Sequence, residues 1–69
     1  MTTPDERTRA VLHTKEFLVE LMSAERTPGI PDAVRSEARR LLRHYPSLTE
    51  LDLAHRALPM FFGDVPPRG

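Results

Sequence analysis

Apolar residues return every three to four positions through most of the chain, and three stretches show this helical period clearly. In the first, no residue breaks a helix between Pro4 and about Glu25. Thr3 and Glu6 have the spacing of a capping box, and Pro4 suits the first helical position. The spacing predicts a helix over about 4–25, with a core-facing side made of Ala10, Val11, Thr14, Phe17, Leu18, Leu21 and Met22.

Proline separates the other two stretches from the first and from each other. Two prolines and a glycine mark residues 26–31 as a connector. A helix over about 31–45 follows and must end before Pro46, because proline disfavours a helical conformation in the preceding residue. Ser47 and Glu50 form a second capping box, which predicts a third helix over about 48–58. The expected inward residues are Val34, Ala38, Leu41, Leu42 and Tyr45, then Leu48, Leu51, Ala54 and Leu58.

The short links between these helices favour antiparallel neighbours, so we expect an all-α fold, a small three-helix bundle. Residues 1–63 form the one expected domain, which ends in a short aromatic turn closed by Gly63. Residues 64–69 are expected to be a frayed, flexible tail. With 69 residues and no cysteine, the helical core or an oligomer interface must carry the stability.

Four apolar residues are candidates for contact with a partner. Leu12 and Val19 lie together on a flank of the first helix, away from its main apolar face. They either touch a second neighbouring helix, which is the favoured interpretation, or form a seam for another protein. Phe61 and Phe62 are adjacent, so they cannot easily both point inward. Burial in the core is favoured for them, and an exposed anchor for a partner is the alternative.

The clearest polar pattern belongs to the second helix, where Arg35, Arg39 and Arg43 recur every four residues and Arg40 lies close to the same side. Like charges at this spacing repel by about 0.2–0.5 kcal/mol per pair, so something should offset them.

Several structural features could offset this repulsion. The helix dipole favours cations near the C-terminus. Asp32 and Glu37 each stand three residues before an arginine, and Glu16 and Glu20 on the first helix offer pairing between helices.

An acidic ligand is the functional alternative to internal pairing of this arginine stripe. Arginine outnumbers lysine nine to one, and its planar fork suits phosphates and carboxylates. His44 would assist the stripe. However, ten basic and ten acidic residues leave no net charge, which counts against nucleic-acid binding through bulk charge. A helix-turn-helix is also disfavoured, because its recognition helix would begin with Glu50 and Asp52.

Catalytic and metal-binding patterns are not evident. His13, His44 and His55 are scattered, and Asp52 with His55 supplies too few ligands for a metal. The sequence suggests no serine or threonine beside a base, and only three glycines are present. We therefore expect neither enzyme activity nor a cofactor.

Neither a signal peptide nor an apolar run of about 20 residues is apparent, so a cytoplasmic location is expected and no membrane contact. The chain also resembles a group of short, uncharacterised, mainly proteobacterial proteins. The resemblance rests on Glu-Arg-Thr-Arg-Ala-Val at 6–11, Val-Arg-Ser-Glu-Ala-Arg-Arg-Leu-Leu-Arg-His-Tyr-Pro-Ser at 34–47 and Ala-Leu-Pro with Phe-Gly at 57–63. It implies a small bacterial protein and transfers no activity.

These observations predict a small helical protein-interaction or regulatory module without catalytic activity. Its most favoured partner is another protein, and a homodimer is an open alternative. Binding of nucleic-acid phosphates by the arginine stripe is the second hypothesis. The partner's identity and the oligomeric state lie beyond the sequence.

Overall fold

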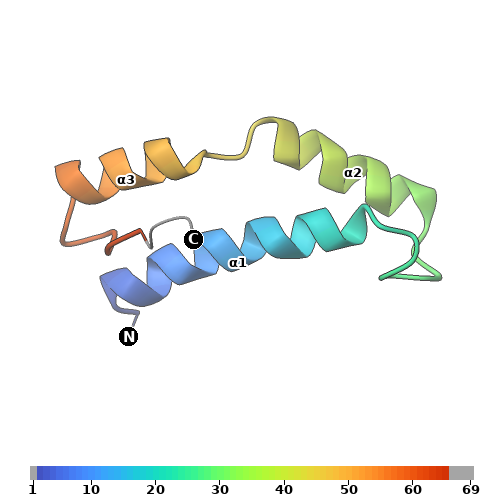
Figure 1. The fold of residues 1–69 in the computed structure, drawn as a ribbon, viewed down its shortest axis with the longest axis horizontal. Coiled ribbons are helices and arrows are strands. Elements are labelled where there is room, and N and C mark those ends of the chain that lie inside the picture. Colours follow the sequence, from blue (N-terminus) through green and yellow to red (C-terminus); the bar gives the residue numbers. More distant parts are fainter. Residues whose placement is uncertain (1, 66–69) are drawn as a thin grey trace. The chain divides into compact units, whose positions relative to one another are not determined.

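A computed structural model describes residues 2–65, which form three α-helices and no strand (Figure 1). These are α1 (Pro4–Leu21), α2 (Asp32–Arg43) and α3 (Leu48–Ala57). The predicted all-α class with three helices is confirmed. Of the tail predicted for residues 64–69, only Asp64 and Val65 are among the described residues.

Both predicted capping boxes are present. The Thr3 backbone N–H donates to Glu6 Oε1 at 2.9 Å, and the Glu6 N–H donates to Thr3 Oγ1 at 3.1 Å. At the start of α3, the Ser47 N–H donates to Glu50 Oε1 at 2.9 Å, and the Glu50 N–H donates to Ser47 Oγ at 3.1 Å. The backbone hydrogen bonds received by the two carboxylates lower the pKa of Glu6 and Glu50 from the ordinary value.

The first helix ends at Leu21 and not, as predicted, near Glu25. Side chains from further along the chain take the carbonyl groups at its end. The Thr27 hydroxyl lies 3.2 Å from the Glu20 carbonyl oxygen and 2.8 Å from that of Ser23. Arg35 Nη1 donates to the Leu21 carbonyl oxygen at 2.7 Å. The Glu20 and Ser23 carbonyl groups also accept hydrogen bonds from the backbone N–H groups of Ser23 and Thr27. At Leu21, the Arg35 guanidinium takes the place of the backbone N–H that a longer helix would supply.

The chain divides into two compact units, which we describe separately. The α1–α3 unit comprises the chain up to Leu12 together with the chain from Pro46 onward. The α1–α2 unit runs from His13 to Tyr45. Each unit therefore contains part of α1 and one further helix (Figure 1).

Few side chains are buried. Leu18 and Ala38 are 8% and 2% exposed in the α1–α2 unit, and Leu51 is 5% exposed in the α1–α3 unit. Burial was predicted for all three. It was also predicted for Phe17, which is 59% exposed. That prediction is wrong because a helix paired with one other helix buries only a narrow stripe, and Phe17 lies beside that stripe.

In the α1–α3 unit, the predicted aromatic turn after α3 is hydrogen-bonded to the start of α1. The Gly63 N–H donates to the Pro4 carbonyl oxygen at 3.0 Å and lies 2.9 Å from Thr8 Oγ1. Thr8 Oγ1 is 3.2 Å from the Gly63 carbonyl oxygen, and the Thr8 side chain is fully buried. Arg7 Nη1 donates to the Phe61 carbonyl oxygen at 2.5 Å. These bonds join segments more than fifty residues apart.

Candidate functional site

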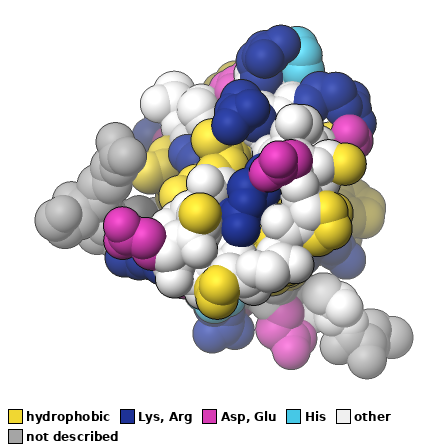
Figure 2. Space-filling view, turned by 90° about the vertical axis from the view of Figure 1, so that its right-hand side faces the viewer, with side chains coloured by type: hydrophobic (Ala, Val, Ile, Leu, Met, Phe, Trp, Pro, Cys, Tyr) yellow, Lys and Arg dark blue, Asp and Glu magenta, His cyan; other side chains and the backbone are white. Residues whose placement is uncertain are grey.

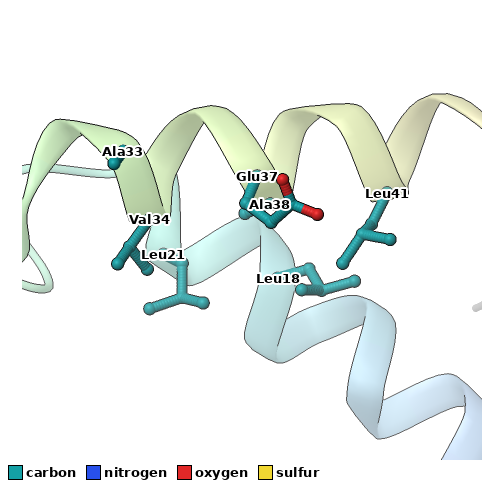
Figure 3. Close-up of a pocket in the computed structure, with 7 residues that line it drawn as sticks. All are labelled: Leu18, Leu21, Ala33, Val34, Glu37, Ala38 and Leu41. Carbon is teal, nitrogen blue, oxygen red and sulfur yellow. The ribbon is translucent and has the colours of Figure 1, made fainter.

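An open apolar groove lies between α2 and the later part of α1, entirely within the α1–α2 unit (Figure 3). Its volume is about 420 Å³. Leu18 and Leu21 line it from α1, and the side chains of Val34 and Leu41 reach toward them from α2 (Figure 3). The remaining lining residues are Ala33, Glu37 and Ala38, so Glu37 is the only charged residue in the lining.

Helical spacing accounts for this lining. Val34, Ala38 and Leu41 follow one another at intervals of four and three residues, which places them on one face of α2. Ala38 is small and almost completely buried. The larger Val34 and Leu41 stay 41% and 42% exposed because no third element of this unit covers them. The groove therefore presents apolar surface to water.

Other large apolar side chains are also more than a third exposed in the described part of the chain. Figure 2 shows hydrophobic side chains reaching the surface among basic and acidic ones. Single exposed apolar residues are ordinary on protein surfaces, whereas a contiguous apolar groove is a feature of binding sites. The exposed set is Phe17, Val19, Met22, Val34, Leu41, Leu53, Leu58, Met60 and Phe61.

The four predicted apolar interface residues do not line this groove. Val19 is 52% exposed and Leu12 is half-buried. Of the two phenylalanines, Phe61 is the exposed one at 54%, and the Arg7 guanidinium lies 5.8 Å from its ring centroid. Phe62 is half-buried. A partner role for these four residues stays a prediction.

The arginine stripe divides into residues with different surroundings. Arg35 is half-buried, and its guanidinium holds the connector between α1 and α2. Nη2 donates to the Thr27 carbonyl oxygen at 2.6 Å, and Nη1 donates to Thr27 Oγ1 at 3.1 Å as well as to Leu21. The expected pairing of Arg35 with Asp32 is not among the ion pairs of residues 2–65, because these uncharged oxygens occupy the guanidinium.

Arg40 forms the predicted ion pair with Glu37, and its Nε donates to Glu37 Oε1 at 3.1 Å. This hydrogen bond lowers the pKa of Glu37 and raises that of Arg40. The predicted pairing of the stripe with Glu16 and Glu20 is not found in the described chain. Instead, Glu20 Oε1 lies 3.7 Å from Nη1 of Arg26, a residue of the connector between α1 and α2.

Arg39 and Arg43 are exposed, and neither side chain has a hydrogen bond or ion pair within residues 2–65. Arg43 lies in the last turn of α2, where the helix dipole stabilises a cation. His44 is also exposed, and its backbone N–H donates to the Leu41 carbonyl oxygen at 3.2 Å. These three residues are therefore the part of the predicted stripe available to a ligand.

Asp52 and His55, the two residues considered together for metal binding, form other contacts within the α1–α3 unit. His55 Nδ1 is 2.8 Å from the Phe62 carbonyl oxygen, and its Nε2 is 3.2 Å from Asp64 Oδ1. Asp52 pairs with Arg56 at 3.0 Å. In the described residues, no three histidines, cysteines or carboxylates cluster as metal ligands. No described helix has the length and apolarity to cross a membrane.

Sequence reasoning identified the apolar positions of α2 but not the groove. The sequence did contain a signal for the groove: two helices with apolar faces are joined by a short connector, so those faces can meet. The missing fact was that no third helix of the same unit covers them.

Scans of family models, curated proteins and solved structures find no significant match to this chain. The resemblance to short bacterial proteins therefore stays a prediction.

Proposed function

We propose that this chain is a small helical protein-binding module, without catalytic activity of its own, that acts in the cytoplasm. An amphipathic helix of another polypeptide would occupy the groove between α1 and α2. The observation that carries the proposal is the apolar lining of this groove, with Val34 and Leu41 each more than 40% exposed.

Binding of a helix in a groove depends on apolar side chains at intervals of three and four residues. The groove walls show the same intervals, at Leu18 and Leu21 on one side and Val34, Ala38 and Leu41 on the other. Complete burial of such a side chain contributes about 1.5–3 kcal/mol, so covering the exposed part of Val34 and Leu41 should contribute roughly 1 kcal/mol each. These two residues are therefore the expected anchors.

Substitution at the groove tests this function directly. A tagged chain is expressed in its native cells together with a second, differently tagged copy, and proteins that co-purify are quantified. We expect Val34→Glu and Leu41→Glu to lose the proteins retained by the unchanged chain, because a carboxylate in the groove must be desolvated on binding. Leu53→Glu is the matched control, since Leu53 is 65% exposed on α3 and lies outside the groove.

Far-ultraviolet circular dichroism establishes that each variant keeps its helices. If folded groove variants retain every co-purifying protein, the groove is not the binding surface and the proposal is wrong.

Binding of nucleic-acid phosphates is the second candidate function, and the observation that favours it is the exposure of Arg39 and Arg43 without a partner in the described chain. Two phosphate contacts would make affinity fall about tenfold between 50 and 200 mM salt. Fluorescence anisotropy with labelled duplex DNA and single-stranded RNA tests this, and binding should vanish in the Arg39→Glu/Arg43→Glu variant. We rank it second because the structure occupies Arg35 with carbonyl groups and Arg40 with Glu37.

A further inference from the structure

The edge of the groove on α2 carries both signs of charge. Glu37 lines the groove, and Arg40 binds it from three residues further along the helix. Their side chains are 56% and 60% exposed, so water screens this pair and its attraction contributes little to folding. Exchanging this exposed pair for pairs with charges on a molecule that covers the groove therefore costs little.

This arrangement of charges is complementary to itself. In a two-fold dimer each surface patch meets its own copy, and an axis that runs across α2 makes the two α2 helices pack antiparallel. Glu37 would then face the second copy's Arg40, and Arg40 would face the second copy's Glu37. A strongly acidic or strongly basic helix would meet one attractive and one repulsive group at the same edge.

The apolar residues follow the same symmetry. Val34 and Leu41 lie on either side of Glu37 along α2, about one residue off the centre of the Glu37–Arg40 pair. An antiparallel copy would place Val34 against the second copy's Leu41 with an offset near 3 Å, the rise of two helical residues and less than one turn. The chain also has no net charge, with ten basic and ten acidic residues, so overall repulsion does not oppose association.

We infer that a second copy of this chain covers the groove, with α2 antiparallel to its counterpart and Glu37 paired to the second copy's Arg40. Together, α1 and α2 of the two copies make a four-helix packing around Val34 and Leu41. This inference rests on the proposed function and names the partner of that same groove.

Sedimentation equilibrium of the full chain, from micromolar to millimolar concentration, tests the inference. We expect a monomer–dimer equilibrium for the unchanged chain. Glu37→Arg should weaken the dimer by about tenfold or more, because it places arginine opposite arginine, and Arg40→Glu should do the same with two glutamates. The double variant Glu37→Arg/Arg40→Glu restores opposite charges and should return the dissociation constant to within about threefold of the original. Glu25→Arg makes the same charge change on an exposed residue outside the groove and should leave the dimer unchanged.

A chain that stays monomeric at millimolar concentration would overturn the inference. So would a dimer that ignores both single substitutions, or one that the double substitution fails to restore. If the unchanged chain is monomeric while Leu41→Glu still loses a co-purifying protein, the groove binds a different polypeptide and only the self-pairing is wrong. If it is monomeric and Leu41→Glu loses nothing, the proposed function fails as well.

Discussion

Arg35 shows how one side chain can fix a connector. Its guanidinium donates to the Leu21 carbonyl oxygen, which ends α1, and to both the carbonyl and hydroxyl oxygens of Thr27. Hydrogen bonds from a charged donor contribute about 1.5–3 kcal/mol, and their loss leaves carbonyl groups unpaired. Arg35 therefore belongs to the structure of the α1–α2 unit more than to a free basic surface.

Replacing Arg35 should consequently destabilise the fold. We expect Arg35→Ala to lower the free energy of unfolding by about 2 kcal/mol, measured by urea denaturation with circular dichroism. Arg39→Ala is the matched control, and its change should stay within about 0.5 kcal/mol because that side chain is exposed. Equal effects of the two substitutions would contradict the structural role of Arg35.

Gly63 is required by a close approach of two backbones. A Cβ atom at this position would lie 2.8 Å from Asp5 Cα and 2.9 Å from the Asp5 nitrogen, and backbone atoms cannot rotate away as a side chain can. We expect Gly63→Ala to cost about 1–3 kcal/mol of unfolding free energy, the usual range for overpacking. Thermal unfolding of this variant beside Ser36→Ala, on the exposed side of α2, checks it. An unchanged Gly63→Ala variant would mean that the turn after α3 is not held against α1.

The helical period of the sequence predicts that Arg35, Arg39 and Arg43 share one face of α2, and it assigns Phe17 to the same face of α1 as Leu18. It could not show which oxygens each arginine reaches, because those of Leu21 and Thr27 come from the helix end and the connector. Thr8, the most buried side chain described, was not predicted either. Its partner Gly63 lies fifty-five residues away, and no local pattern records that contact.

The starts of α1 and α3 were predicted best from the sequence, because a capping box is a local signal. Both boxes were predicted from Thr3 with Glu6 and from Ser47 with Glu50, and both form. The end of α1 was predicted less well. Its position depends on Thr27 and Arg35, which lie beyond the helix and take its final carbonyl groups.

The two capping boxes should make helix stability depend on acid. The pKa of Glu6 and of Glu50 is lower in the folded chain than the ordinary value of 4.5. The unfolded chain therefore binds protons first as the pH falls, so the stabilisation is complete above this value and is lost below it. Glu37, whose pKa Arg40 lowers, adds in the same direction.

We expect the melting temperature to fall between about pH 5 and about pH 3, with a smaller fall in the Glu6→Gln/Glu50→Gln variant. Glutamine can keep the capping geometry without a titrating group. Circular dichroism melts across this range measure both chains. Parallel pH profiles for the two would show that the boxes do not carry the acid dependence.

The apolar surface of the whole molecule is only partly covered by its own helices. Leu18, Ala38 and Leu51 are the buried apolar residues of the described chain, whereas Val34 and Leu41 remain open in the groove. The sequence predicted the helices and the apolar face of α2, and it indicated that the helical core or an oligomer interface must carry the stability. The groove itself could not be predicted, because it is open only where no third helix of the same unit covers the two apolar faces.

The central claim is that protein occupies the groove between α1 and α2, and site-specific photo-crosslinking in native cells tests it most directly. A photoreactive phenylalanine analogue replaces Leu41 in one chain and Leu53, which is exposed on α3 and outside the groove, in another. We predict discrete covalent adducts from position 41 and none from position 53, with an adduct of twice the chain mass if the occupant is a second copy. Absence of adducts from position 41, or identical adducts from both positions, would contradict the account.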